Sequence, residues 1–478
     1  MTCIKKFLSL EKLLKMERKS FIQSIFGAGA LLSIPFCTNS IDTEEINLQI
    51  KNISKKCNGS MIGFRAEPIS KVKIGLIGIG NRGKTLIQML DLLLEEQKAE
   101  VVALGDLDKK NIDYALNYLK GKQKLVPKTY FNGENDWQNI ATLEDVDLLL
   151  IATPWNWHAE MAILGMENGK HVASEVPIAC TLEDCAKLVE TAERTKKHCI
   201  MIENCCYNDE ELWIMNMIQE GVFGELTHAE CAYNHDLRAL LLDKKYYKNQ
   251  WRIKHHVERN GNFYPTHGIG PVSFYMNIGR GDTFKYLTSM SSKEQSLSLA
   301  VEKTKSNFPK IKCGDVNTSL IKTEEGKSIM LQFDVHTGRP YSRINQLVGT
   351  KAVHEGYPSR LYIDAEELEF WGHKWLSKED YLTFSKKYQH PMITKLKKIS
   401  ESFKQGHGGM DFIMIHRLIS CLNQGVSLDI NVYDSVMWSV ISPLSELSAS
   451  LDSKPILFPD FTSGKWKEKR KNEIMRDI

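Results

Sequence analysis

Apolar and polar residues follow a strand–helix–strand order from Lys71 onwards. Residues 71–77 have the composition of a buried strand, and apolar residues then recur at helical spacing from Lys84 to Leu94. A continuous apolar run at 147–152 is typical of a central strand in a parallel sheet. Further strands are predicted at 100–104, 171–174 and 199–203, and further helices at 158–168 and from Thr181, the expected N-cap, to about Arg194. Strands that alternate with helices predict an α/β fold with a doubly wound parallel sheet.

The pattern changes after about residue 205. Strand-like runs become more frequent, as at 225–233 and 328–335, and few long helices are expected. This change indicates a second domain of the α+β class. We therefore divide the chain into an N-terminal segment (1–37), a linker (38–70), a first domain (71–204), a second domain (205–451) and a C-terminal tail (452–478). The basic run at 465–471 is interpreted as part of a solvated tail.

The N-terminal segment has the features of an export signal. Arg18-Lys19 precedes Ser20-Phe21, and residues 22–36 carry no charge. This apolar stretch is short for a membrane span. Arg-Lys before Ser-Phe-Ile is similar to a twin-arginine signal, and Cys37 resembles the acceptor cysteine of a lipoprotein. We expect an exported protein, either periplasmic or lipid-anchored to the cell envelope, with residues 38–70 as a polar tether.

Composition narrows the function classes. The 478 residues include 62 Lys and Arg against 59 Asp and Glu, a net charge of +3, so the charge gives no reason to expect nucleic-acid binding. None of the 11 cysteines forms a CxxC pair, and the paired spacing of zinc ligands is missing. His255-His256 has no third ligand at metal spacing, and we interpret it as polar surface. The cysteines are predicted to be buried free thiols, with no metal site.

The first chemical motif lies between the first strand and the first helix. Gly78, Gly80 and Gly83 form a GxGxxG, in which the first glycine permits a tight turn and the second lets a pyrophosphate approach the backbone. The third allows the helix to pack closely on the strand, and the helix N-terminus faces the phosphates. Asp106 ends the second strand, where an acid that binds the ribose hydroxyls belongs. This pattern predicts a Rossmann domain that favours NAD over NADP.

Other polar residues follow the carboxyl ends of the later strands. Ligands of open α/β sheets bind at this edge, so the loop from Trp155 to His158, together with Thr153, Glu175 and Asn204, is expected beside the cofactor.

From Lys71 to about Leu451 the chain resembles the Gfo/Idh/MocA family of NAD(P)-dependent sugar oxidoreductases. That family usually has Glu-Lys-Pro after its fifth strand, with the Lys in proton transfer, whereas this chain has Glu175-Val176-Pro177. Within the family the chain resembles the glycoside hydrolase 109 group. The motifs that carry this resemblance are Trp155-Asn156-Trp157-His158, Glu175-Val176-Pro177, Tyr233-Asn234-His235-Asp236-Leu237-Arg238, Trp251-Arg252, Tyr264-Pro265-Thr266-His267-Gly268, Arg339-Pro340-Tyr341-Ser342 and Gly406-His407-Gly408-Gly409-Met410-Asp411.

The resemblance implies two sets of contact residues and a largely antiparallel, open sheet that covers the cofactor. Cofactor contacts are implied for Asn81, Arg82, Asp106, Trp155, Asn156, Trp157, His158, Glu175, Val176 and Asn204. Substrate contacts are implied for Tyr233, Arg252, Tyr264, Pro265, Thr266, His267 and Tyr341.

The resemblance also implies an activity, the release of terminal α-N-acetylgalactosamine with one tightly held NAD per chain. In the implied order, NAD takes a hydride from C3, a base removes the C2 proton, the aglycone leaves, water adds and the hydride returns. Net redox change is zero. Hydrolysis of this kind is an exception to the usual pair of carboxylates, and no such pair stands out in the second half of the chain.

His267 is the best acid–base candidate, because the pKa of histidine lies near working pH. Pro265 and Gly268 favour an exposed turn at this position. Tyr341 and Tyr207 are further catalytic candidates, although tyrosines at such positions are more often packing residues. Two alternatives stay open: an NAD-dependent sugar oxidoreductase of the same fold, and a non-enzymatic sugar-binding lipoprotein. A homo-oligomer, formed through the exposed sheet face as in other family members, also stays open.

Overall fold

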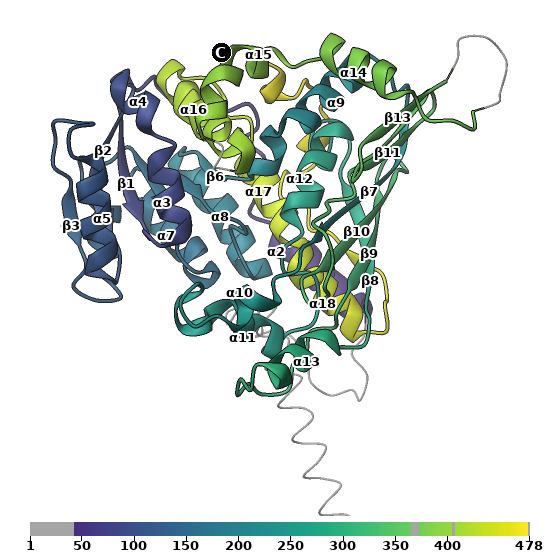
Figure 1. The fold of residues 1–478 in the computed structure, drawn as a ribbon, viewed down its shortest axis with the longest axis horizontal. Coiled ribbons are helices and arrows are strands. Elements are labelled where there is room, and N and C mark those ends of the chain that lie inside the picture. Colours follow the sequence, from purple (N-terminus) through teal and green to yellow (C-terminus); the bar gives the residue numbers. More distant parts are fainter. Residues whose placement is uncertain (1–42, 365–371, 404–406, 477–478) are drawn as a thin grey trace, which may run out of the picture.

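Two β-sheets with helices between them make up the protein (Figure 1). The computed structural model describes residues 43–364, 372–403 and 407–476. The predicted export signal and Cys37 lie outside these residues. Within the described ranges, no helix is both long enough and apolar enough to cross a membrane.

The first sheet is parallel throughout and has the strand order β3-β2-β1-β4-β5-β6. This arrangement confirms the predicted Rossmann sheet. Its strands are β1 (Val72–Ile77), β2 (Ala99–Gly105), β3 (Lys128–Tyr130), β4 (Leu148–Ile151), β5 (His171–Ser174) and β6 (Cys199–Met201). Its helices are α3 (Asn81–Gln88), α4 (Asp91–Glu95), α5 (Lys109–Leu119), α6 (Trp137–Ala141), α7 (His158–Glu167) and α8 (Leu182–Thr195). As expected, Thr181 caps α8, where its hydroxyl accepts a hydrogen bond from the Asp184 backbone N–H.

The second sheet has the order β13-β12-β11-β7-β10-β9-β8-β14. Only β7 and β10 pair in parallel among its described strands, so the prediction of a largely antiparallel sheet is confirmed. The strands are β7 (Leu226–Asn234), β8 (Phe284–Ser291), β9 (Asn317–Thr323), β10 (Ser328–Asp334), β11 (Gln346–Gly349), β12 (Ala352–Glu355), β13 (Arg360–Ile363) and β14 (Ile456–Leu457).

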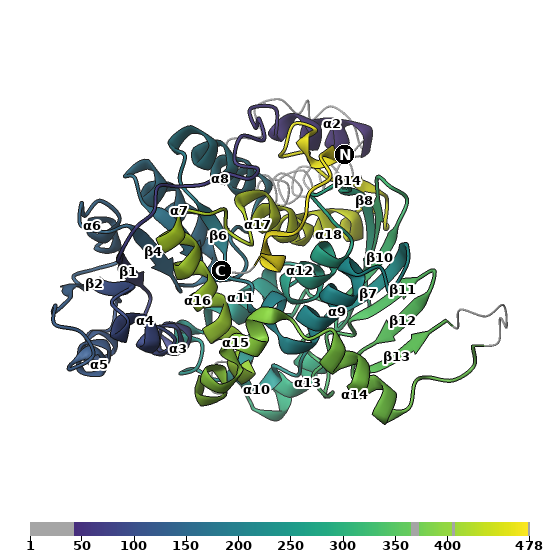
Figure 2. The same ribbon diagram turned by 90° about the horizontal axis from the view of Figure 1, so that it is seen from above.

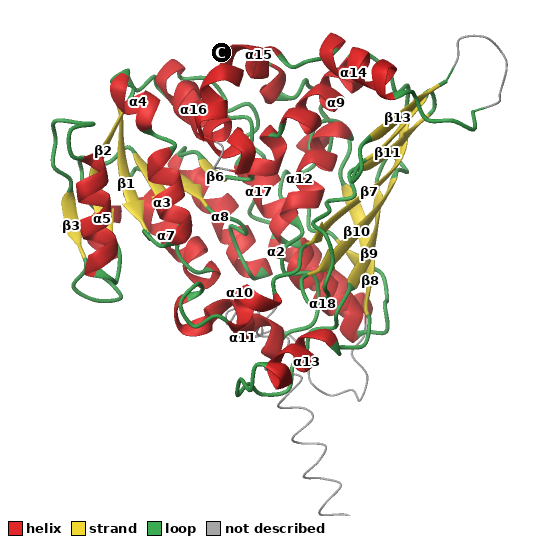
Figure 3. Cartoon of the chain, viewed as in Figure 1, coloured by secondary structure: helices red, strands yellow, loops and turns green. Residues whose placement is uncertain are grey.

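Helices of the second domain fill the space between the two sheets, as Figures 2 and 3 show. The helix α12 packs on β7, α18 packs on β8, and α17 contacts β6 of the first sheet. The helices of this domain are α9 (Asp209–Gln219), α10 (Arg238–Leu242), α11 (Trp251–Glu258), α12 (Thr266–Tyr275), α13 (Ser296–Lys303), α14 (Lys378–Lys387), α15 (Pro391–Ser400), α16 (Met410–Gln424), α17 (Val432–Ser439) and α18 (Ile441–Ser450). Among the described helices of this domain, only α9 with 11 residues and α16 with 15 residues exceed ten residues, so the expectation of few long helices is confirmed, although short helices are numerous.

The described part of the segment expected as a tether, residues 43–70, is folded onto the protein. Helix α2 (Thr43–Ile53) buries Ile46 and Ile50, and lies against α8 and β14. The Asn47 side chain accepts a hydrogen bond from the Leu457 backbone N–H at 2.9 Å. Four-residue spacing of two isoleucines is enough to anchor a helix that is otherwise polar.

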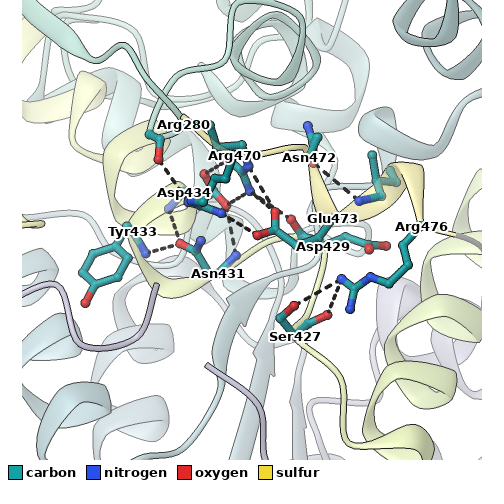
Figure 4. A network of polar contacts seen from close by, with 12 residues as sticks. Arg280, Ser427, Asp429, Asn431, Tyr433, Asp434, Arg470, Asn472, Glu473 and Arg476 are labelled. Atoms are coloured by element: carbon teal, nitrogen blue, oxygen red, sulfur yellow. Dashed lines mark hydrogen bonds and ion pairs between the residues drawn. The ribbon is translucent and has the colours of Figure 1, made fainter. Parts of the chain in front are cut away.

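The C-terminal segment is also packed, although Lys465, Lys467, Lys469 and Lys471 of its basic run are exposed. The interpretation of a solvated basic run therefore holds for these lysines and is wrong for Arg470. Figure 4 shows the polar network that holds the segment. Buried Arg280 pairs with Asp434 at 2.8 Å and with Glu473 at 2.9 Å. Arg470 also pairs with Glu473, so a basic side chain of the tail is used in an internal ion pair. Ile474 is fully buried beside this network.

Candidate functional site

The glycine loop has the geometry that a dinucleotide requires. Gly78 has φ +88°, and a Cβ there would lie 2.6 Å from the Ala152 carbonyl oxygen. A Cβ on Gly83 would lie 2.0 Å from the Gly78 carbonyl oxygen, so the helix could not approach the strand. A Cβ on Gly80 would meet no atom within 4 Å, and no side chain caps the start of α3. Open backbone N–H groups at this point suit a pyrophosphate.

Asp106 lies beside this loop at the carboxyl end of β2. Its Oδ2 accepts a hydrogen bond from the Ile79 backbone N–H, and its Oδ1 accepts one from the Asp108 N–H, both at 2.7 Å. The half-buried carboxylate is thereby fixed next to the phosphate loop, at the place of a ribose-binding acid. These residues fit NAD.

Arg82 joins the two domains at the cofactor side of the site. Its Nε donates to Glu175 Oε1 at 2.5 Å, and Nη1 and Nη2 donate to the two Asp411 oxygens at 2.6 and 2.9 Å. Asn204 Nδ2 donates to the same Asp411 at 2.8 Å. Burial opposes ionisation of Asp411, but Arg82 and His407 hold the pKa of this carboxyl well below its usual range. Asp411 of α16 thus contacts two predicted cofactor residues, Arg82 and Asn204, and is joined through Arg82 to a third, Glu175.

The loop after β4 contains one exposed and several enclosed side chains. Asn156 is exposed, Trp157 is half-buried and Trp155 is buried. Both ring nitrogens of His158 lie 2.7 Å from carbonyl oxygens, those of Pro177 and Thr153. Burial lowers the pKa of His158. We infer that His158 positions the loop against the Glu175–Pro177 turn. Within that turn, Val176 is buried and apolar.

Arg252 of α11 lies at the centre of an aromatic cluster. Its Cζ is 4.9 Å from the centroid of the Trp155 ring and 4.8 Å from that of Tyr264, and its Nη1 donates to the Tyr247 hydroxyl at 2.7 Å. Cation–π contacts of this kind hold a guanidinium in place when water is excluded. Tyr233 packs on Tyr264 with 4.6 Å between ring centroids. Because Trp155 belongs to the first domain, predicted cofactor and substrate residues meet here.

His267 forms a dyad with a buried glutamate. The Nδ1 of His267 lies 2.7 Å from Oε1 of Glu203. Glu203 is fully buried and lies two residues after the end of β6. Burial alone would raise the pKa of Glu203, but the neighbouring His267 lowers it below its usual value. Glu203 was not predicted as a site residue, although its place after the parallel strand β6 is a signal of the same kind as that of Glu175, which follows β5.

His267 does not lie in the exposed turn that the sequence suggested. It is the second residue of α12, next to buried Thr266 and Pro265, and only 14% of its side chain is exposed. Its ring is 5.2 Å from that of Tyr233 and 4.8 Å from that of Tyr264. His267 therefore borders the same aromatic cluster as Arg252.

The two other tyrosine candidates differ in placement. The Tyr341 ring lies 6.2 Å from that of Tyr233, and its hydroxyl accepts a hydrogen bond from Arg343 at 3.1 Å, so it belongs to the cluster. Burial raises the pKa of Tyr341. The buried Tyr207 instead directs its hydroxyl to Asp429, 3.4 Å away. This placement corrects the interpretation of Tyr207 as an acid–base residue.

Comparison with known proteins agrees with this two-domain site. Residues 72–203 match the oxidoreductase family with an NAD-binding Rossmann fold, and residues 207–468 match the C-terminal domain of glycosyl hydrolase 109. The chain belongs to glycosyl hydrolase family 109. This family 109 protein is therefore a glycosidase that carries an NAD-binding Rossmann domain, and the predicted family is confirmed.

Relatives with curated names cover most of the family 109 chain. A glycosyl hydrolase family 109 protein from Shewanella putrefaciens is 43% identical over 418 residues, which is 86% of this chain and 90% of the relative. A protein from Shewanella oneidensis named alpha-N-acetylgalactosaminidase is 42% identical over 412 residues, 85% of this chain and 88% of the relative.

Solved structures of low sequence identity share the fold. An NAD binding oxidoreductase from Klebsiella pneumoniae has a TM-score of 0.60 at 15% identity, covering 81% of this chain and 99% of its own. A myo-inositol 2-dehydrogenase from Lactobacillus plantarum has a TM-score of 0.57 at 15% identity, with the same coverage of the two chains.

Proposed function

We propose that this family 109 glycosidase releases terminal α-N-acetylgalactosamine and holds one NAD tightly. The observation that supports the proposal best is the His267–Glu203 dyad beside the Arg252 cluster, which contacts Trp155 of the NAD-binding domain. The name of the Shewanella oneidensis relative supports the choice of sugar. When bound, NAD would supply the hydride acceptor and donor.

The residues of this chain supply proton transfer and orientation. An ionised Glu203 accepts a hydrogen bond from the Nδ1–H of His267. The Nε2 of His267 is then the unprotonated nitrogen, which can take a proton from a substrate carbon. Arg252 presents a fixed positive charge that is suited to an oxygen on which negative charge develops. Buried Val176 can move no proton, which disfavours an ordinary dehydrogenase at this site.

The test follows two products at once. Purified protein is incubated with p-nitrophenyl α-N-acetylgalactosaminide, with and without added NAD, while nitrophenol and NADH are both measured. We expect nitrophenol without net NADH, and no loss of activity when NAD is omitted. NADH that accumulates on free sugar without cleavage would instead identify an oxidoreductase. Sugar binding that survives His267→Ala, with no turnover in either channel, would identify a binding protein.

We also propose export with the cofactor already bound. The support is the sequence of residues 18–37, which resembles a twin-arginine signal before a lipoprotein cysteine. Protein released from the cell envelope should contain nucleotide after heat denaturation, and Cys37→Ser should move it from the membrane fraction to the soluble periplasm. Envelope protein without nucleotide would refute loading before export.

A further inference from the structure

Three side chains of types that can bind a metal lie together near the aromatic cluster around Arg252. One of them belongs to the His255-His256 pair, which the sequence suggested to be polar surface. His255 and His256 are buried in α11, which corrects that interpretation. One donor atom each from His256, Cys313 and His336 lies within 4.8 Å of the others, and all three residues are buried. They come from α11, from the loop before β9 and from the turn after β10.

The polar atoms of this cluster are incompletely paired. The His336 Nε2 lies 2.9 Å from the His256 Nδ1, which uses one nitrogen of each ring. Of the other two nitrogens, His336 Nδ1 faces the Asp315 carboxylate at 3.8 Å, beyond hydrogen-bond distance, and the buried His256 Nε2 has no hydrogen-bond partner among the described residues. Buried polar atoms without partners are rare in proteins and need an explanation. The neighbours of His256 include the rings of Phe263 and Phe333, which supply no hydrogen bond acceptor of ordinary strength.

Backbone contacts hold the three ligands in register. The Lys312 and Cys313 backbone N–H groups donate to the His256 carbonyl oxygen at 3.1 and 2.9 Å. The His336 N–H donates to Asp334 Oδ1 at 3.1 Å, which fixes the turn after β10. The ligands are therefore presented by segments that are already joined, and each side chain has little freedom to lose on binding an ion.

A carboxylate stands behind one of the histidines. Asp315 Oδ1 lies 3.8 Å from His336 Nδ1. Histidines that ligate metals commonly face a carboxylate with their second nitrogen, which orients the ring and adds negative charge. With one thiolate and this carboxylate, the site would balance the charge of a divalent cation.

We propose that His256, Cys313 and His336 bind a zinc ion. Thiolate sulfur with imidazole nitrogen is the ligand combination that zinc prefers. We assign the fourth ligand to the Gly314 carbonyl oxygen, to which the Cys313 thiol donates a hydrogen bond at 3.5 Å. On binding, the Cys313 thiol gives up its proton to solvent and forms the sulfur–zinc bond.

The ion would act as a cross-link under the sugar site. His256 is one helical turn after Arg252, and His255 packs on Trp155 with 4.9 Å between ring centroids. A zinc ion that joins α11 to β9 and β10 would therefore brace the helix that carries Arg252. Its role is structural, and it needs no part in the reaction.

The test measures metal content and does not depend on glycosidase activity. The full chain is purified without a metal-affinity tag, in the presence of reductant, and its zinc is measured by mass spectrometry. We expect stoichiometric zinc in the wild type and in Cys231→Ser, which changes an equally buried cysteine of β7 outside the cluster. Cys313→Ser should lose the zinc. Equal zinc in all three proteins, or none in any, would overturn the proposal.

A second measurement does not depend on whether Cys313→Ser folds. Zinc is replaced by cobalt in the wild-type chain and in Cys231→Ser, and the absorption spectrum of each is recorded. Thiolate-to-cobalt charge transfer is expected in the wild type and in Cys231→Ser. A folded wild-type chain that takes up neither zinc nor cobalt, or that binds cobalt without the thiolate band, would refute the site whatever the variants do.

Discussion

The pairing of Glu203 with His267 makes a strong prediction about catalysis. Replacement of Glu203 by Gln keeps the shape of the side chain and removes its charge. The bond that it alters is 2.7 Å long and lies at a fully buried carboxylate, so water cannot replace the lost charge. A hydrogen bond to a charged group contributes about 1.5–3 kcal/mol. At about 1.4 kcal/mol for each factor of ten, we expect kcat to fall roughly 10- to 150-fold.

The assay is nitrophenol release over a range of substrate concentrations, from which kcat and KM are obtained separately. The substitution alters the group that accepts from the Nδ1 of His267 and orients its ring, so the loss should appear in kcat. KM should change little, because the carboxylate lies behind the histidine and not against the substrate.

A matched variant separates this effect from a general loss of stability. Glu193 is also a buried glutamate, but it accepts hydrogen bonds from the Asn58 and Gly59 backbone and from the Tyr433 hydroxyl. Glu193→Gln should lower the melting temperature and leave kcat unchanged. An unchanged kcat in folded Glu203→Gln would refute the reasoning.

Three further predictions concern the cofactor loop and the packing of the domains. Gly83→Ala places a Cβ 2.0 Å from the Gly78 oxygen, so the purified variant should release no nucleotide on denaturation, whereas the wild type releases one per chain. Arg82→Met removes the guanidinium that is paired with buried Asp411, leaving it only Asn204 and His407, and should cost about 3–5 kcal/mol in chemical denaturation. The pKa of Asp411 is lowered in the folded state, so its stabilising effect is complete above about pH 4 and is lost as pH falls further. Arg82→Met should flatten that dependence, and an unchanged slope would contradict the assignment. Ile50→Ala should cost about 2–5 kcal/mol, since Ile50 is fully buried; a change below 0.5 kcal/mol would mean that α2 does not pack as described.

The first domain could be predicted from two local patterns. Its strands are buried on both faces and are therefore continuous apolar runs, and the glycines of its GxGxxG motif are typical of the turn between a strand and a helix that binds a dinucleotide. Strands at 171–174 and 72–77 match their predicted ranges closely. Helix α2 was missed because only Ile46 and Ile50 face the core, and two apolar residues in a polar segment do not define a period. The packing of the tail was missed for a similar reason, since Arg280, which pairs with Glu473 of the tail, lies far away in the sequence.

Residues of each domain could be predicted to lie at the site, but the contacts between the two domains could not. Residues that follow parallel strands meet at one edge whatever the sequence between them, so Glu175 and Asn204 were expected together. Arg82 was expected beside them only from the family resemblance. The carboxylate that joins them, Asp411, is 207 residues from Asn204, and no local spacing predicts such a contact. The dyad of His267 with Glu203 has the same origin, because it depends on how α12 docks against β6.

The contact between α2 and β14 affects the order in which the protein can be made. Asn47 and Leu457 are hydrogen-bonded although 410 residues separate them. A ribosome delivers the chain from its N-terminus, so α2 emerges long before the strand against which it packs exists. Ile46 and Ile50 can pack against α8 once that helix has been synthesised, but the contact of α2 with β14 forms only when the chain is almost complete.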